Sequence, residues 1–532
     1  MQDLLVAGRI YTMDPANPVA EGALVREGRF VHVGSLAECA LRARPGAGRL
    51  EIGRGSATAG LCDAHGHVLW YGRSLIELSC AGLSDEAACV ERVAAASLKV
   101  PPGQWIRGHG WDHNLWPETR FPTLARLSAA TPRHPVALER ADGHALWANA
   151  LALKLCGIRD DTRDPAGGRI LRAPDGSPTG VFIDNAADLV LRNIPPLSRS
   201  EVEAALVVAL SELARAGLTA VHDAGVSPDG LEVYRQLALE DRLPLRVYGM
   251  IDGQSPLEQV EQQMACWRRT PQVGRLEVRA VKFFADGALA SRGAALFEPY
   301  DDDPGNRGLF VTAPDELRRR IAVVLRAGFQ PAVHAIGDWA CAEVLKAFAA
   351  VEKAQLQRGQ LRVEHLQVLL PRDVQLLAGV VASMQPIHAV NDAAWAERRL
   401  GRGTARQAGA YAWRQALQGG AVLAFGSDFP VESFDVRQGL LAAELRVPRG
   451  ASLPWMPEQR LTRQEALEAY TVGAAIAGLA GRRRGMVRAG HDADLTVFAG
   501  DILAASVEEL PSLAITHTVV SGIVAPVGAR GR

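Results

Sequence analysis

Two histidines separated by one residue, His65 and His67, are the side chains in this sequence with the clearest capacity for chemistry. In a β-strand, side chains two positions apart point to the same face, so both imidazoles can bind one metal ion. Gly66 between them leaves room for a close approach by other atoms. Because a His-x-His pair also arises by chance, its interpretation depends on finding further ligands in the chain.

Four more residues of ligand type fall at or near the ends of apolar, strand-like segments: Lys282, His334, His365 and Asp428. Each has a simpler interpretation when taken alone. A lysine can extend to the surface, an aspartate can cap a helix, and a histidine can form hydrogen bonds within a loop. Neither capping nor core packing accounts for such residues at five separate strand ends, so the set predicts a metal site.

The segments that must position these residues alternate between short apolar strands and helices. The predicted strands cover residues 59–63, 218–222, 245–250, 278–284, 330–334, 361–365, 380–384 and 422–425, with helices such as 315–327 and 341–351 between them. Eight repeats of strand and helix predict an α/β fold, a TIM-like (β/α)8 barrel. In such a barrel the predicted ligands converge at the C-terminal ends of the strands.

Two features depart from a plain barrel. The gap between the first two strands is about 150 residues, where one unit needs about 30–40, so we expect a large insertion at about 70–215. Strand-like segments with turn signals also occupy both ends of the chain, which predicts a small β-sandwich built from both termini. The predicted domains are therefore 1–58 and 483–532 for the sandwich and 59–482 for the barrel.

The composition excludes several other classes of protein. The 532 residues include 58 Lys+Arg and 59 Asp+Glu, and a net charge of -1 gives no general attraction to nucleic acid or anionic lipid. The apolar start of the chain is interrupted by Arg9, unlike a secretory signal, and the most apolar long stretch, 202–221, carries three charges, unlike a membrane span. Seven scattered cysteines indicate a reducing compartment, so we expect a cytoplasmic protein.

Several motifs along the chain resemble the amidohydrolase superfamily, and within it amidohydrolase family 3, the YtcJ-like proteins that include N-substituted formamide deformylases. The matching stretches are His65-x-His67, Gly110-Trp111-Asp112, Asp142-Gly143-His144-Ala145, the segment 281–287 around Lys282, the segment 333–338 around His334, Glu364-His365, Met384-Gln385-Pro386 and Gly426-Ser427-Asp428. The resemblance covers essentially the whole chain, and the motifs are specific as a set.

The resemblance implies a barrel flanked by a sandwich from both termini and a divalent metal centre, usually with two zinc ions. It implies that His65 and His67 bind the first metal with Asp428, that His334 and His365 bind the second, and that Lys282 bridges both as a carbamate formed with CO₂. A metal-activated hydroxide would then attack an amide-type C–N bond of an N-acyl or N-formyl amine. Asp428 is expected to move the proton from the water to the leaving amine.

Candidate substrate contacts are weaker and come mostly from the insertion. They are His109, Trp111, Asp112, Trp116 and His144, together with Asp286 and His388; the tryptophans equally suit the core of the insertion, and His222 is interpreted as a structural residue. The same ligands would serve a hydrolase of esters, lactones or ring C–N bonds, and a catalytically silent barrel with a structural role is the third alternative. The expected partner is a small-molecule substrate, and a homodimer is left open.

Overall fold

Eight parallel strands form the central sheet of the protein, whose computed structural model describes residues 2–352 and 356–527. They are β6 (Leu61–Gly66), β13 (Leu218–Val226), β14 (Arg246–Asp252), β16 (Leu276–Phe284), β17 (Gln330–Ala335), β18 (Arg362–His365), β19 (Val381–Met384) and β20 (Val422–Phe425). Their order in the sheet follows the chain from β6 to β20, and a short strand β15 (Gln272–Val273) pairs with β16. The predicted barrel and its eight strands are confirmed.

Among the described residues, backbone hydrogen bonds join the edge strands β6 and β20 at their C-terminal ends. Gly66 forms a parallel bridge with Phe429, just beyond β20. The backbone N–H of His67 donates to the carbonyl oxygen of Phe429 at 2.9 Å, and that of Asp428 donates to the carbonyl oxygen of His65 at 2.7 Å. The seam that closes the barrel is therefore made by the residues that carry predicted metal ligands.

Two glycines permit this close approach. A Cβ atom on Gly66 would lie 2.0 Å from the Phe429 ring, and one on Gly426 would lie 2.4 Å from the backbone nitrogen of His65. The space predicted beside Gly66 is thus filled by an aromatic ring of the neighbouring loop. Any larger side chain at either position would push β6 and β20 apart.

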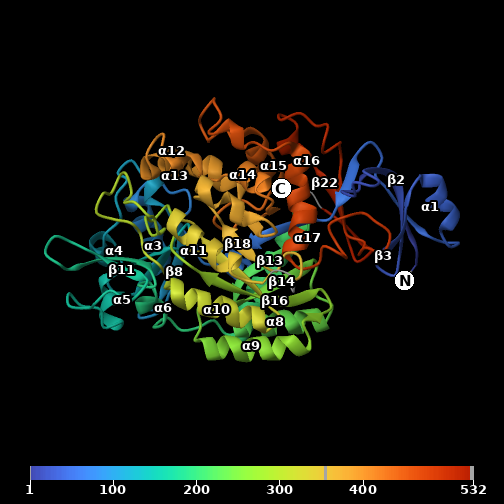
Figure 1. Cartoon of the computed structure of the whole chain (residues 1–532). Helices are drawn as coiled ribbons and strands as arrows, with labels where there is room; N and C mark the ends of the chain where they lie inside the picture. The colour runs from blue at the N-terminus through green and yellow to red at the C-terminus, as the bar shows by residue number, and fades with distance from the viewer. Residues whose placement is uncertain (1, 353–355, 528–532) are drawn as a thin grey trace.

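Helices surround the barrel and bury their apolar faces against it (Figure 1). They are α2 (Val68–Ile76), α7 (Arg199–Arg215), α8 (Pro228–Leu239), α9 (Leu257–Arg269), α10 (Pro314–Arg326), α11 (Asp338–Ala349), α12 (Pro386–Leu400), α13 (Ala405–Ala408), α14 (Trp413–Gln418), α15 (Val436–Leu445), α16 (Arg463–Glu468) and α17 (Ala474–Ala477). In α10, Leu317, Ile321 and Val324 are buried at helical spacing, and α7 begins with a capping box of Ser198 and Glu201. The spacing of apolar residues in α10 and the capping box of α7 are both visible in the local sequence, so these two helices can be predicted from it.

The insertion after β6 folds as a separate six-stranded sheet. Its strands are β7 (Leu78–Ser79), β8 (Ile106–Trp111), β9 (Val136–Arg140), β10 (Ala145–Ala148), β11 (Gly168–Arg172) and β12 (Pro178–Asp184), with α3 (Glu86–Ser97), α4 (Leu124–Ala130), α5 (Ala150–Leu155) and α6 (Asp188–Leu191) around them. Trp111, Trp116 and Trp147 belong to its own apolar core. Figure 1 shows this unit at the side of the barrel away from the N-terminus.

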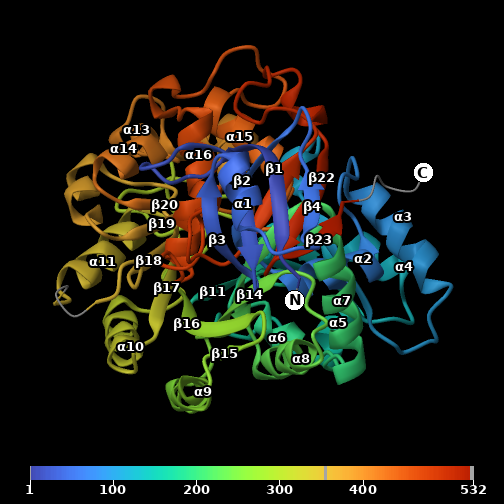
Figure 2. The same cartoon turned by 90° about the vertical axis from the view of Figure 1, so that its right-hand side faces the viewer.

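Both ends of the chain contribute to a third sheet (Figure 2). It contains β1 (Leu4–Tyr11), β2 (Val19–Arg26), β3 (Arg29–Gly34), β4 (Gly48–Glu51), β5 (Ser56–Ala59), β21 (Leu495–Phe498), β22 (Ile515–Val520) and β23 (Ile523–Pro526), and α1 (Leu36–Arg42) packs on it. β5 and β21 are antiparallel neighbours, which joins the two ends of the chain. The pairing predicted from the two strand-rich termini is confirmed, while the predicted domain boundaries stay predictions.

A buried ion pair joins this terminal sheet to the barrel. Arg246, the first residue of β14, donates from Nε to Asp494 at 2.7 Å and from Nη2 to the second carboxylate oxygen at 3.0 Å. Both side chains are nearly fully buried.

Within the described ranges, no helix combines the length and the apolar character that a membrane crossing requires.

Candidate metal centre

The six predicted ligands come together at the C-terminal mouth of the barrel. His65 is the penultimate residue of β6 and His67 follows the strand. Lys282 and His334 lie near the ends of β16 and β17, His365 ends β18, and Asp428 follows β20. The side chains of His65, Lys282 and His334 have at most 1% of their surface exposed, and only His67 is partly exposed. Charged and polar groups buried this deeply require partners or a bound ion.

The ligand atoms of these residues converge on Asp428. Its Oδ1 lies 3.2 Å from Nε2 of His67 and 3.5 Å from Nε2 of His65. One ligand atom from each of His65, His365 and Asp428 lies within 4.8 Å of the others. Oδ1 of Asp428 is buried without a hydrogen-bond partner, so the site contains an oxygen that a cation would satisfy.

Contacts behind the rings orient three of the histidines. Nδ1 of His65 bonds to Glu364 at 2.6 Å, Nδ1 of His67 to the carbonyl oxygen of Ala224 at 2.9 Å, and Nδ1 of His365 to Gln385 at 2.9 Å. With Nδ1 engaged in this way, Nε2 of each ring is left for a metal ion. Such outer contacts fix the tautomer and orientation of histidine ligands in metal sites.

His334 occupies the far side of the cluster. Its Nε2 lies 3.4 Å from the carbonyl oxygen of Gly287, and its ring packs at 4.7 Å from the ring of His365. The ring of His144 from the insertion lies 5.3 Å away. His334 therefore lies beside His365, on the opposite side from the pair of His67 and Asp428.

Burial favours the neutral forms that metal ligation requires. Burial, with Lys282 nearby, lowers the pKa of His65 to about 4, and burial lowers the pKa of Lys282 to about 8. Nζ of Lys282 lies 3.1 Å from Nε2 of His65 and, among the described residues, has no carboxylate within ion-pair distance. Neutral imidazoles, a neutral amine and a carboxylate form a donor set that fits a divalent cation such as zinc.

Two of the predicted ligands have a strained backbone. Asp428 has φ 61° and His365 has φ 70°, both in the left-handed region that non-glycine residues rarely adopt. Such conformations cost about 1–3 kcal/mol each and persist where the surroundings enforce them. Asp63 supplies part of that enforcement, because its carboxylate accepts the N–H groups of His65 and Ser427 at 3.1 Å and the Ser427 hydroxyl at 2.6 Å.

Two adjoining cavities open from the cluster. The inner one, about 70 Å³, is lined by His334, His365 and Asp428 together with residues of the insertion and of α12. The outer one, about 430 Å³, is lined by aromatic side chains that include Trp70, Tyr71, Phe429 and Phe434. Val431 and Glu432 line both, so the two cavities are neighbours beside the cluster.

Comparison with known proteins identifies the family. A model described as "Amidohydrolase family" matches residues 55–525. The chain belongs to the amidohydrolase family. The predicted resemblance is thereby confirmed, and the ligand motifs lie within the matched region.

Three proteins are similar to this amidohydrolase over nearly its whole length. YtcJ of Bacillus subtilis (strain 168) is 31% identical to this chain, and the match covers 98% of this chain and 99% of YtcJ. YtcJ is itself assigned to the amidohydrolases only provisionally. The N-substituted formamide deformylase of Arthrobacter pascens is 27% identical over 98% of each chain. The crystal structure of an uncharacterized metal-dependent hydrolase from Pyrococcus horikoshii OT3 has a TM-score of 0.76 and 24% identity, covering 95% of this chain and 99% of that one. This structure has the same fold.

Three of the predicted substrate contacts of the amidohydrolase line the cavities. His109 lies on the outer cavity, and His144 and His388 lie on the inner one. Nδ1 of His144 bonds to Asp184 at 2.6 Å. Burial opposes protonation of His144, but the hydrogen bond to Asp184 outweighs it and raises the pKa of His144 to about 8. These positions stay candidates for substrate binding.

The other predicted contacts have structural surroundings instead. Trp111 is fully buried and its indole N–H donates to Leu138, while Trp116 packs beside it, so both tryptophans belong to the core of the insertion. Asp112 caps a 3-10 turn and pairs with Arg140. Asp286 is fully buried and accepts backbone N–H groups from the loop after His334. The two tryptophans are therefore enclosed within the insertion, while Oδ1 of Asp286 also lies 3.6 Å from Nε2 of His334, beside a predicted ligand.

Sequence reasoning missed the residues that hold the ligands from behind. Glu364 and Gln385 stand inside quoted motifs, but no role was predicted for them, and Ala224 acts through its backbone. The signal for Glu364 was its position beside His365, on a strand next to the one that carries His334. Asp392 and Glu432, which line the inner cavity, carried no signal because they come from a helix and a loop.

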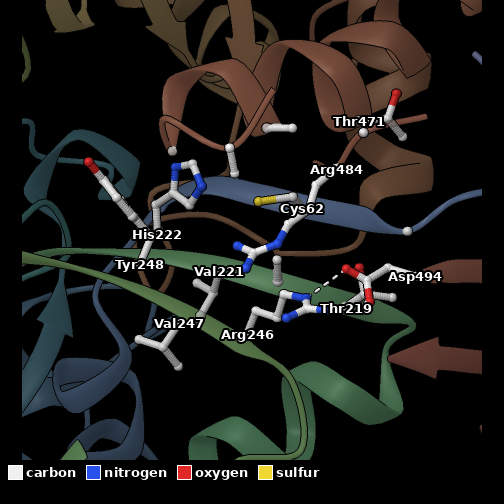
Figure 3. A pocket seen from close by; sticks show the side chains of 16 residues that line it. Cys62, Thr219, Val221, His222, Arg246, Val247, Tyr248, Thr471, Arg484 and Asp494 are labelled. Atoms are coloured by element: carbon white, nitrogen blue, oxygen red, sulfur yellow. Dashed lines mark hydrogen bonds and ion pairs between the residues drawn. The ribbon is translucent and has the colours of Figure 1, made fainter. Parts of the chain in front are cut away.

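A further cavity of the amidohydrolase lies at the N-terminal ends of the strands, beneath the terminal sheet (Figure 3). It measures about 40 Å³ and is lined by the Arg246–Asp494 pair, Arg484 and Cys62. His222 also lines it, in the middle of β13, and bonds to Arg362 at 3.0 Å. A cavity of this volume can hold one or two water molecules. The position of His222 on the wall of so small a cavity agrees with its interpretation as a structural residue.

Proposed function

We propose that this protein is a metal-dependent amidohydrolase that hydrolyses an amide-type C–N bond of an N-acyl or N-formyl amine. The observation that supports it most is the cluster of His65, His67 and His365 around the orphaned oxygen of Asp428, with Lys282 and His334 beside these rings. The likeness to a protein described as an N-substituted formamide deformylase over nearly the full length supports the bond type.

The proposed ligands divide between two divalent ions, with zinc as the proposed metal. His65, His67 and Asp428 would hold the first, and His334 and His365 the second, with Lys282 as a carbamate between them. A lysine with a pKa near 8 is partly neutral at physiological pH, and the neutral amine is the form that reacts with CO₂. When bound, the metal supplies Lewis-acid chemistry: it acidifies water and polarises the scissile carbonyl.

Asp428 is the proposed proton carrier. Burial would raise the pKa of this carboxyl, but contact with His67 and the nearby His65 and His365 holds it well below its ordinary value. The group is therefore ionised and ready to accept a proton from the attacking water. It would then return that proton to the nitrogen of the leaving amine, so that the amine departs as a neutral molecule.

Glu364 and the insertion have supporting roles in this proposal. The Glu364 carboxylate would keep Nδ1 of His65 protonated and Nε2 free, which maintains the geometry of the ligand through turnover. His144, presented by the insertion at the inner cavity, lies where it can donate a hydrogen bond to a substrate oxygen. Asp142 and His144 of the insertion line the inner cavity, so the insertion would help to shape the substrate site.

The seven cysteines are all free, as expected of a reducing compartment, and we propose a cytoplasmic location.

Metal analysis of the purified protein, followed by a screen of N-formyl, N-acetyl and aminoacyl amides, tests the function. We expect bound zinc, iron or manganese and hydrolysis that a chelator abolishes and added metal restores. A protein without metal, inactive after metal addition, would contradict the proposal.

A further inference from the structure

The walls of the two cavities carry several carboxyl groups but, among the described residues, no lysine or arginine. Four carboxylates line the inner cavity: Asp142, Asp392, Asp428 and Glu432. Apart from its histidines and the proposed metal ions, the wall offers an anionic substrate group no cationic side chain to compensate its charge.

Two of these carboxylates already have a partner or a function. Asp142 pairs with Arg140, and Asp428 is the proposed metal ligand and proton carrier. Asp392 and Glu432 remain. Asp392 accepts a hydrogen bond from the Tyr411 hydroxyl at 2.6 Å, and Glu432 accepts two from the Asn391 amide at 2.8 Å. These donors are neutral, so they hold the carboxylates in place without cancelling their charge.

The positive groups near the two carboxylates act only from a distance. Neither carboxylate forms an ion pair within 4 Å in the part of the chain that the structure describes. At longer range His388 has the largest charge influence of the basic groups on both, followed by Arg399 for Asp392 and Arg449 for Glu432. Burial raises the pKa of Asp392 to about 7 and raises that of Glu432 as well. A cation that entered the cavity would stabilise both in their ionised forms.

One face of helix α12 lines the inner cavity. His388, Asp392 and Trp395 all line the inner cavity and follow one another at helical spacing. Asn391 on the same helix reaches across to Glu432 in the loop after β20. The helix thereby brings Glu432 to the same side of the cavity as Asp392.

A second observation indicates that a ligand occupies this space. His388 is only 6% exposed, and its Nε2 is buried without a hydrogen-bond partner, 4.0 Å from Oδ2 of Asp428. Its Nδ1 contacts the amide nitrogen of Gln367 at 3.2 Å, which leaves Nε2 to carry the hydrogen. A buried N–H at the cavity wall suits an acceptor oxygen on a ligand, such as the oxygen of an acyl group.

We propose that Asp392 and Glu432 form an ammonium subsite beside the metal centre, so that the substrate is an amide carrying a protonated primary amine close to the scissile bond. The inference rests on the proposed function and deepens it. The amine can belong to the acyl part, as in an aminoacyl amide, or to the amine part, as in a mono-acylated diamine. Both present the same –NH₃⁺ group, which can bond to both carboxylates at once.

The kinetic test compares substrates that differ only in charge. One pair is N-formyl-1,4-diaminobutane and N-formylpentylamine, and the other is glycine butylamide and propionic acid butylamide. In each pair a methyl group replaces the ammonium group. We expect kcat/KM to favour the charged member of at least one pair by about 10- to 100-fold, and Asp392→Asn or Glu432→Gln to remove most of that preference. The pair that shows it identifies the side of the substrate that carries the amine.

A binding experiment separates this inference from the proposed function. Butylammonium is titrated by calorimetry into the metal-loaded protein, with 1-pentanol as the neutral comparison and Asp315→Asn, on the exposed start of α10, as the matched control. We expect affinity for butylammonium to fall about tenfold in Asp392→Asn and Glu432→Gln but not in Asp315→Asn. Binding that responds in this way while no amide is hydrolysed supports the subsite and removes the proposed function.

Two results would overturn the subsite. One is hydrolysis of the neutral members of both pairs at least as fast as the charged members, which would leave the proposed function intact. The other is butylammonium affinity that is equal in the wild type and in Glu432→Gln, provided that the variant has the same melting temperature and metal content. Because the comparison of substrate pairs uses the unaltered protein, it decides the question even if a variant fails to fold.

Discussion

Glu364 contacts Nδ1 of His65 at 2.6 Å, and both side chains are completely buried between the barrel strands. Glu364 also pairs with Arg362, which binds the carbonyl oxygen of Ala64 beside His65. This chain of contacts connects the interior of the barrel to the ligand. The carboxylate of Glu364 therefore interacts with both His65 and Arg362, and Arg362 in turn binds the strand that carries His65.

Replacing Glu364 by glutamine should weaken metal binding without removing a ligand. The amide offers a weaker acceptor to His65, and loss of such an outer partner lowers metal affinity by about 10- to 100-fold. Competition with a chelator, followed by elemental analysis, measures the change. Glu298→Gln, at a largely exposed carboxylate, is the control. Equal metal retention in Glu364→Gln and the wild type would show that this contact does not tune the ligand.

Asp428→Asn should separate metal binding from turnover. The amide oxygen can still face the ion, so most of the metal should remain, but an amide cannot accept the proton from water at neutral pH. General acid–base catalysis contributes about 10²- to 10⁴-fold, and we expect a loss in kcat of that size or more. Activity near that of the wild type, with metal content verified, would remove Asp428 from the proton-transfer step.

Lys282→Ala tests the proposed carbamate. This variant should lose metal occupancy, and acetate or propionate should restore part of it by supplying the missing carboxylate. Lys346→Ala, on the exposed face of α11, is the matched control and should behave as the wild type does. Full occupancy in Lys282→Ala without added acid would contradict a bridging role.

Acid should weaken the joint between the terminal sheet and the barrel. Burial opposes ionisation of Asp494, but the Arg246 guanidinium holds its pKa below the ordinary value. The unfolded chain therefore binds a proton more readily than the folded one, so this stabilisation is complete above about pH 4 and is lost as the pH falls through the folded pKa. Urea unfolding between pH 3 and pH 7 should show the decline.

Arg246→Met should remove that joint at all pH values. It leaves the Asp494 carboxylate buried without its main partner, which typically costs about 3–5 kcal/mol. The variant should also lose part of the acid dependence, because the pKa of Asp494 rises once the guanidinium is gone. Arg215→Met, on an exposed turn of α7, is the control. A variant with wild-type stability would show that the apolar contacts alone join the two units.

The barrel was predictable because its strands are short apolar runs that alternate with helices. The predicted ligands were found because polar residues such as Lys282 and His365 lie in or at the ends of these runs. The cavity walls were less predictable. His388 was named, but Asp392 and Glu432 acquire their roles only when α12 meets the loop after β20. Trp111 shows the opposite failure, since its motif does not reveal which side of a strand faces the core.

The seam of the barrel has a consequence for the whole chain. His65 and Asp428 lie on the two edges that meet there, more than 350 positions apart in the sequence, and short backbone hydrogen bonds hold those edges together at their C-terminal ends. An ion bound by both residues would fasten the first strand to the last. Loading the metal would then complete the closure of the barrel as well as its chemistry, and the free energy of metal binding would contribute to the stability of the fold.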